Sequence, residues 1–555
     1  MSQNLARLRE HATRWLADDP DPATRAELQD LLARAGHDAA AAADLADRFA
    51  GPLQFGTAGL RGAMGAGPHR MNRVSVGRAA AGLAHWLVRR GGGGVVVGYD
   101  ARTDSDRFAR DTAQIMTGAG LPAMVLPRPL PTPVLAFAIR RLGAAAGVMV
   151  TASHNPATDN GYKVYLGDGT QIVPPDDADI ARCIEAVDHL RNVPRDDGWT
   201  TLDDDVVDDY VTTAAALVPP HAPRDLTIVS TAMHGVGGEV LARVLTAAGF
   251  APPHEVPAQQ QPDPAFPTVP FPNPEEPGAL DLALALAVDT DADVVLANDP
   301  DADRCAVAVP SADGGWRALT GDEVGALLGQ LCASESSSGT LATSIVSSSR
   351  LQSIAAAHGL GFVRTLTGFK WIGRVPGLVF GYEEAIGYCV DPQHVADKDG
   401  ISAALRIAQL AAQLKVDGRS LLDALDDLDA RYGVHHTSQV SVRGDDLTVL
   451  RQRSAHIAAE PPTRLGGLAV SSHEDLGRGV DGLPPTQGVR LWLAGVVDGG
   501  STRVIVRPSG TEPKVKAYVE VVVPVTSQRP LGSARAVAAE ASAALLADLT
   551  ELLSA

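Results

Sequence analysis

Two short polar segments of the chain carry side chains whose types and spacing suit phosphate and metal chemistry. The first, residues 151–156, reads Thr-Ala-Ser-His-Asn-Pro and follows directly on the apolar residues 144–150. That apolar run predicts a strand, and open α/β folds bind ligands beyond the carboxyl ends of their strands. Ser153 has His154 beside it and Lys163 further along the chain. A serine among cationic donors favours phosphate chemistry; a Ser/Asn/Pro turn without chemistry is the alternative.

The second segment holds three alternating carboxylates, Asp299, Asp301 and Asp303, after an apolar strand. Like charges this close repel each other unless a cation neutralises them. An EF-hand is excluded because its sixth and twelfth positions require Gly and Glu, where this chain has Arg304 and Pro310. Oxygen ligands without a neighbouring Cys or His favour Mg²⁺ over zinc. The segment predicts a magnesium site, with a solvated acidic turn as the alternative.

A third polar segment, residues 507–514, follows an alternating strand near the end of the chain. A guanidinium, two hydroxyls and approachable backbone amides for an anion come from Arg507, Ser509, Thr511 and Gly510. This combination predicts a loop that holds a phosphate group while chemistry happens elsewhere. An ordinary hairpin turn is the alternative.

A fourth segment pairs two carboxylates, Glu383 and Glu384, between glycines. Carboxylates can accept hydrogen bonds from vicinal sugar hydroxyls, and side chains alternate along an extended chain, so we expect one glutamate to face the ligand. Three cationic side chains, Arg304, Lys370 and Lys398, are candidate substrate contacts. For the two lysines, a solvated surface position is the alternative.

Taken in chain order, with the glutamate pair before residues 507–514, these four segments resemble the α-D-phosphohexomutase family, which contains phosphoglucomutases and phosphomannomutases. The resemblance starts at residues 55–62 (Phe-Gly-Thr-Ala-Gly-Leu-Arg-Gly) and spans nearly the whole chain. It implies an α/β fold of four domains, three with mixed sheets and a C-terminal α+β domain, around a central cleft. We expect residues 1–203 to carry a helical N-terminal extension and the serine loop, and residues 204–318 to carry the metal loop. Residues 319–436 would carry the sugar loop, and residues 437–555 the phosphate loop.

The resemblance also implies roles for these side chains. In the family, the serine that matches Ser153 is phosphorylated in the active enzyme, and a phosphoserine oxygen shares Mg²⁺ with the aspartates that match the triplet. By the same match, Arg61 and Lys163 would lie beside the transferring group and assist proton transfer and charge stabilisation. His154 is expected to hydrogen-bond the phosphate or to hold the loop. The matching loops at Glu383 and Arg507 would select the sugar and grip the distal phosphate.

The expected reaction moves phosphate between the 1- and 6-positions of glucose or mannose. It would proceed through a phosphoserine enzyme, with a hexose 1,6-bisphosphate as intermediate and activator. One departure is Ala385, because many hexomutases have serine there; the surrounding Tyr-Glu-Glu-Ala-Ile-Gly resembles the branch that contains phosphoglucomutase 2 and phosphopentomutases. A phosphopentomutase is therefore the alternative, a Mg²⁺-dependent sugar phosphatase a more remote one, and a non-catalytic sugar-phosphate-binding regulator the last.

Composition limits the partners. The chain has 555 residues, 45% hydrophobic and 20% charged, with a net charge of −19. Such acidity argues against nucleic acid or an anionic membrane as the main partner and is compatible with small-molecule sugar phosphates. Four cysteines without a CxxC pair indicate a reducing cytoplasm, and neither a signal peptide nor a membrane span is predicted. We expect a cytoplasmic monomer or homodimer.

Overall fold

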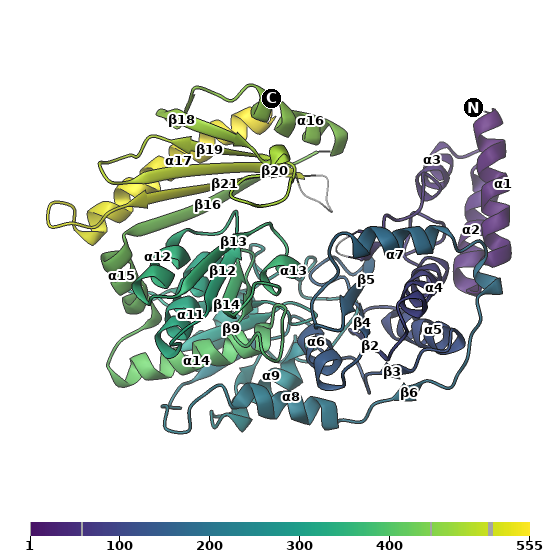
Figure 1. The fold of residues 1–555 in the computed structure, drawn as a ribbon, viewed down its shortest axis with the longest axis horizontal. Coiled ribbons are helices and arrows are strands. Elements are labelled where there is room, and N and C mark those ends of the chain that lie inside the picture. The colour runs from purple at the N-terminus through teal and green to yellow at the C-terminus, as the bar shows by residue number, and fades with distance from the viewer. Residues whose placement is uncertain (1, 57–58, 445–446, 509–513, 555) are drawn as a thin grey trace. The chain divides into compact units, whose positions relative to one another are not determined.

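The protein forms two compact units, each built from two stretches of chain. The computed structural model describes residues 2–56, 59–444, 447–508 and 514–554 (Figure 1). The first unit contains Met1–Leu319 and Gly387–Gln413, and the second contains Thr320–Ile386 and Leu414–Ala555. The chain runs through four sheets, three in mixed α/β layers and a last antiparallel one.

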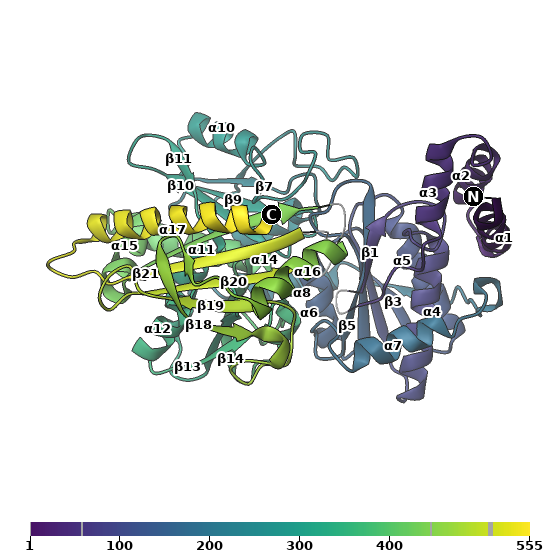
Figure 2. The same cartoon turned by 90° about the horizontal axis from the view of Figure 1, so that it is seen from above.

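Three helices form an N-terminal extension beside the first sheet (Figure 2): α1 (Ser2–Asp18), α2 (Pro22–Arg34) and α3 (Ala39–Arg48). They share a small core of their own, and the Asp18 carboxylate accepts the backbone N–H of Leu190 at 2.8 Å. The stretch for which the sequence predicts a helical extension is therefore helical, and it contacts the chain at Leu190.

The first sheet has the order β1-β5-β4-β2-β3-β6. Strand β2 is parallel to β3 and β4, whereas β5 is antiparallel to β4 and β1. The apolar run before the serine loop is β4, buried along its whole length, as predicted. The strands are β1 (Leu60–Ala63), β2 (Val95–Tyr99), β3 (Ala123–Val125), β4 (Ala146–Val150), β5 (Asp159–Leu166) and β6 (Thr200–Thr201). The helices around them are α4 (Arg73–Arg89), α5 (Ser105–Gly118), α6 (Thr132–Arg141), α7 (Asp176–Glu185) and the short η1 (Leu190–Asn192).

The second sheet has the order β11-β10-β9-β7-β8. Strand β9 is buried throughout and pairs antiparallel with β10, so the acidic segment forms the loop between them. The strands are β7 (Ile228–Thr231), β8 (His254–Glu255), β9 (Val294–Asn298), β10 (Cys305–Pro310) and β11 (Trp316–Ala318). The helices are α8 (Asp205–Ala215), α9 (Gly237–Ala247) and α10 (Asp281–Asp289). Residues 257–277 form a long loop without a helix or strand.

In the third sheet, β12 lies parallel to and between β13 and β14. Its elements in the second unit are β12 (Thr340–Ser344), β13 (Gly361–Thr365), β14 (Leu378–Glu383), α11 (Gly321–Glu335), α12 (Arg350–Ala357), α13 (Phe369–Ile372) and α15 (Leu421–Tyr432). Strand β15 (Gly387–Cys389) and most of helix α14 (Gly400–Val416) belong to the first unit. The sugar-loop segment lies at the end of β14.

The last sheet is antiparallel, with the order β16-β21-β20-β19-β18-β17. Its elements are β16 (Val434–Arg443), α16 (Leu447–Ala459), β17 (Arg464–Leu465), β18 (Leu468–Asp475), η2 (Leu476–Arg478), β19 (Val489–Leu493), β20 (Ser501–Pro508), β21 (Lys514–Val523) and α17 (Leu531–Ser554). The alternating strand predicted before residues 507–514 is β20. Strand β19 ends at Leu493, before the chain turns through Gly499, whose φ of 76° suits glycine.

Among the helices of the described ranges, none is both long enough and apolar enough to cross a membrane.

Candidate active site

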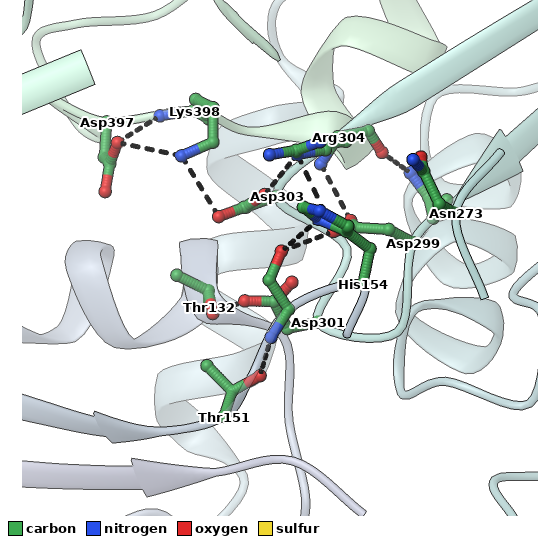
Figure 3. Close-up of polar contacts among 12 residues, drawn as sticks. Thr132, Thr151, His154, Asn273, Asp299, Asp301, Asp303, Arg304, Asp397 and Lys398 are labelled. Carbon is green, nitrogen blue, oxygen red and sulfur yellow. Dashed lines mark hydrogen bonds and ion pairs between the residues drawn. The ribbon is translucent and has the colours of Figure 1, made fainter. Parts of the chain in front are cut away.

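Ser153 stands at the end of β4 in a strained backbone conformation. Its φ of 53° lies in the left-handed region, which is uncommon for residues other than glycine and is often found where function demands it. The Thr151 hydroxyl accepts the Ser153 backbone N–H at 2.9 Å (Figure 3). The Ser153 side chain is directed at the acidic loop: its Oγ donates to Asp299 Oδ2 at 2.9 Å and lies 3.2 Å from His154 Nδ1. Two segments 146 residues apart in sequence therefore meet here.

Arg102 binds the backbone of the serine loop. Its guanidinium donates to the carbonyl oxygens of Ser153 at 2.6 Å and Asn155 at 2.7 Å. Asp100, 1% exposed, forms an ion pair with Arg102 at 3.2 Å, and the Asp100 carboxylate also accepts the Ser105 hydroxyl at 2.7 Å. Burial raises the pKa of Asp100 although Arg102 opposes the rise. This buried pair fixes the backbone on which Ser153 sits.

The three aspartates converge as the metal prediction requires. Asp299, Asp301 and Asp303 are fully buried, and each offers one carboxylate oxygen within 4.8 Å of the others. The turn that aligns them contains Ala302 at a φ of 54°. Asp301 Oδ1 and Asp303 Oδ1 have no hydrogen-bond partner among the described residues. Buried, unpartnered carboxylate oxygens are costly without a cation, so these residues fit a hard divalent ion such as Mg²⁺.

Glycines bring a neighbouring loop close enough to support the aspartates. A Cβ on Gly235 would lie 2.3 Å from Pro300 Cα, and one on Gly237 would lie 2.8 Å from Ala302 Cβ. Neither distance is compatible with a larger residue unless the backbone shifts. The segment Met-His-Gly-Val-Gly-Gly, which follows β7, therefore packs closely against the acidic loop.

Cationic side chains surround the acidic cluster. Lys163, on β5, donates from Nζ to Asp301 at 2.7 Å and to Asp303 at 2.9 Å. Lys398 Nζ lies 3.1 Å from Asp303, and Arg304 Nε lies 3.8 Å from it. Lys398 is 9% exposed, which excludes the solvated surface position. The sequence-predicted Ser153, Lys163, Arg304 and Lys398 thus join the aspartates in one site of the first unit.

The environment shifts the pKa values of two of the carboxyl groups in opposite directions. Burial, together with the neighbouring Asp301 and Asp303, raises the pKa of Asp299 well above its usual range. Burial works the same way on Asp303, but Lys163 and Lys398 outweigh it and lower the pKa of that carboxyl. Of these two carboxylates, Asp299, the partner of Ser153, is therefore the less compensated by neighbouring cations. A cation at the cluster would remove the repulsion between the carboxylates.

His154 and Arg61 flank the serine. Burial, Arg304 and Arg61 lower the pKa of His154 well below its usual range, so its ring is neutral at neutral pH. Arg61, partly buried on β1, donates from Nη1 to Asn155 Oδ1 at 3.2 Å. A neutral ring can accept a hydrogen bond from Ser153 Oγ or donate one to an anion there. Both residues therefore lie beside the serine loop.

Thr132 belongs to the site but was missed by the sequence analysis. Its hydroxyl donates to Asp301 Oδ2 at 2.6 Å, and its backbone N–H donates to the Asp301 carbonyl oxygen at 2.9 Å. It opens helix α6 after Pro131. The sequence signal, a threonine between two prolines, reads as an ordinary helix start.

The sugar-loop glutamates are separately anchored in the second unit. Glu384 accepts the hydroxyls of Ser344 at 3.2 Å and Ser347 at 3.0 Å. Glu383 accepts the backbone N–H of Gly368 at 2.7 Å. The two carboxylates thus accept hydrogen bonds from different partners. Lys370 lies two residues beyond Gly368, in the short helix α13.

The phosphate loop is described only at its start. Arg507 lies partly buried near the end of β20, opposite Lys516 of β21. The predicted contacts Ser509, Gly510 and Thr511 lie outside the described residues.

Comparisons with known proteins extend over all four sheets. Family models described as phosphoglucomutase/phosphomannomutase alpha/beta/alpha domains I, II and III match residues 52–191, 208–314 and 320–432, and the C-terminal domain model matches residues 494–525. A Haemophilus influenzae protein, provisionally named a phosphomannomutase, is 48% identical over 81% of this chain and 93% of its own length. The human phosphopentomutase is 35% identical over 95% of this chain and 93% of its own length.

A crystal structure gives the same result. A protein from Thermus thermophilus, also provisionally named a phosphomannomutase, superposes with a TM-score of 0.70 at 26% identity, covering 91% of this chain and 99% of its own. The fold and the relatives define an isomerase that transfers phosphate within a sugar, a phosphosugar mutase. Its acidic cluster fits the magnesium ion expected of such an enzyme. More particularly, the chain belongs to the phosphoglucomutase/phosphomannomutase family, the α-D-phosphohexomutases.

Proposed function

We propose that this enzyme moves phosphate between the 1- and 6-positions of a hexose, glucose or mannose, with Ser153 as the residue that carries the transferred group. The observation that supports this proposal most is the contact between Ser153 Oγ and the acidic cluster, 2.9 Å from Asp299 Oδ2. A hydroxyl in that place can exchange a phosphoryl group beside a site for a divalent ion, where charge is best neutralised. The hexose 1,6-bisphosphate would be both the intermediate and the activator.

Mg²⁺, held by Asp299, Asp301 and Asp303, would neutralise charge on the phosphoserine. The chain's own residues perform the remaining tasks. Lys163, within 3 Å of two of these carboxylates, is placed to meet charge that develops on the transferring group and to hold or release a proton at the sugar hydroxyl. Arg61 and His154 flank Ser153 and supply further hydrogen bonds to an anion there.

The first half-reaction breaks the bond between Ser153 Oγ and phosphorus and forms one between the sugar hydroxyl oxygen and phosphorus. The sugar hydroxyl loses its proton to a basic group of the site, and Ser153 regains one. The second half-reaction reverses these bonds at the other end of the sugar. Glu383 and Glu384 would bind the sugar hydroxyls, and the loop from Arg507 to Thr511 would hold the phosphate that stays in place. Arg304, Lys370 and Lys398 would add substrate contacts.

A pentose phosphate is the second candidate substrate, because Ala385 removes a hydroxyl from the sugar loop and the human relative is a phosphopentomutase. The four expected domains, a monomeric or dimeric state and a cytoplasmic location complete the proposal.

A substrate panel tests the proposed function. Purified enzyme with Mg²⁺ is given glucose 1-phosphate, mannose 1-phosphate or ribose 1-phosphate, with and without a trace of the matching bisphosphate. The proposal predicts the highest kcat/KM with a hexose phosphate and a shorter lag with the bisphosphate. A higher kcat/KM with ribose 1-phosphate would make the pentose reaction the main one. Release of free phosphate from every substrate without isomerisation would refute the mutase proposal.

A further inference from the structure

A loop of the second sheet, residues 259–276, contains no helix or strand and is held by side-chain contacts. We call it the bridging loop. The Thr268 hydroxyl lies 2.8 Å from His234 Nε2 and accepts the Gln259 side-chain amide at 2.9 Å. Val269, 5% exposed, packs in the small core of this loop. The ordering of a proline-rich loop by buried polar and apolar contacts indicates that its shape is needed.

Phe266 is the unusual residue of the bridging loop. Its φ is 47°, a left-handed value at which a bulky side chain is a genuine outlier, and yet it is only 4% exposed. Its ring lies under Arg102, with the guanidinium carbon 5.0 Å from the ring centroid. Ala157, which follows the serine loop, packs against the same core. Phe266 thus adopts its strained backbone conformation where its ring faces the buried Arg102 guanidinium.

Arg102 is the group through which this ring can act on the chemistry. The same guanidinium donates to the carbonyl oxygens of Ser153 and Asn155 and pairs with Asp100. A ring face stabilises a desolvated guanidinium and fixes the plane in which its hydrogen bonds can form. A change of that plane would move the Ser153 backbone, and with it the Oγ that lies 2.9 Å from Asp299.

Two more contacts tie the bridging loop to the site. The Phe271 ring is 6.1 Å from the His154 ring, centroid to centroid, and Glu275 Oε2 lies 3.9 Å from Arg304 Nη1. The bridging loop thus contacts Arg102, the serine loop and the acidic loop, each at one point. These contacts connect the serine loop and the acidic loop through the bridging loop.

We infer that Phe266 is a positioning residue for phosphoryl transfer, which acts through Arg102 by holding the guanidinium that aligns Ser153 with the acidic cluster. The inference rests on the proposed role of Ser153. Phe266 is not proposed to touch the substrate, so its loss is expected to lower kcat and to leave KM unchanged.

The test compares two variants of Phe266 with a control in the same core. Phe266→Leu keeps an apolar side chain but loses the ring, and kcat should fall by up to about thirtyfold, the rate equivalent of one desolvated cation–π contact. Phe266→Tyr keeps the ring and should retain kcat within about threefold of wild type. Val269→Ala, the control, should lower Tm without lowering kcat. An equal loss of kcat in Phe266→Leu and Phe266→Tyr, or in Phe266→Leu and the control, overturns the inference.

A double-mutant cycle separates action through Arg102 from a general loss of structure. In an Arg102→Lys background, Phe266→Leu should cause no further fall in kcat, because the guanidinium that it orients is gone. Additive losses would overturn the inference. Labelling of Ser153 by radioactive substrate phosphate is measured in the wild type in parallel. Absence of label there refutes the proposed function itself, whereas a labelled wild type with full activity in Phe266→Leu refutes only the role of Phe266.

Discussion

Replacement of Lys163 by methionine tests how the acidic cluster is stabilised. The Lys163 ammonium lies 2.7 Å from Asp301 and 2.9 Å from Asp303, and all three side chains are buried. Methionine keeps the length of the side chain but removes the charge and the two hydrogen bonds. The variant therefore leaves two carboxylates, within a group of three, without their main partner.

The expected loss can be worked from this geometry. Removal of one partner from a buried ion pair costs about 3–5 kcal/mol, because the remaining charge is left desolvated and uncompensated. For a unit as large as the one that holds the site, this corresponds to a fall in Tm of about 5 °C. Mg²⁺ replaces part of the missing positive charge, so a saturating concentration should raise the Tm of Lys163→Met more than that of wild type.

Thermal unfolding with EDTA and with excess MgCl₂ measures both effects. Lys415→Met, a change of the same charge at an exposed position on α14, is the matched control and should shift Tm by less than about 1 °C. Activity of Lys163→Met should be lost in either condition. An unchanged Tm in EDTA, or an equal Mg²⁺ response in variant and wild type, would show that Lys163 does not compensate the aspartates.

Three further predictions concern the metal loop, the phosphate loop and the second unit. Asp301→Asn should weaken Mg²⁺ activation at least tenfold in the activating concentration; a wild-type Mg²⁺ titration would contradict the ligand assignment. Arg507→Ala should raise KM at least tenfold and change kcat little, because binding of a non-reacting phosphate is uniform along the reaction; a selective fall in kcat would contradict this. Burial, with the nearby charge of Glu384, raises the pKa of Asp322 to about 6. Between about pH 4 and pH 6, Asp322 is therefore protonated in the folded unit but ionised in the unfolded chain. The free energy of unfolding falls by about 2–3 kcal/mol as pH rises through that window. Asp322→Asn should therefore raise Tm at pH 7.5 but not at pH 4, and equal shifts at both pH values would refute the raised pKa.

The local signals along the chain were strong enough to predict most elements. Apolar runs that end in a polar loop predicted strands β4 and β9, and the loops after these two strands both belong to the site. The alternating pattern before residues 507–514 predicted β20 in the same way.

The site itself was predictable where residue type restricts chemistry. An acidic triplet and a serine beside cationic residues have few other uses together, so their role could be proposed without coordinates. Thr132 and Phe266 could not be found in this way. Each acts through a contact with a residue far away in the sequence, Asp301 and Arg102 respectively, and neither residue type is unusual for a helix start or a proline-rich loop. Only the packing of the two sheets reveals them.

The most direct test of the central claim is to locate the phosphate on the enzyme during turnover. Enzyme incubated with a radiolabelled sugar phosphate and Mg²⁺ is quenched in acid, digested and mapped by mass spectrometry. An acid-stable phosphate is expected on Ser153, lost in Ser153→Ala and chased by unlabelled substrate at least as fast as kcat. A hydroxylamine-labile label on Asp299, or full turnover by Ser153→Ala, would contradict it.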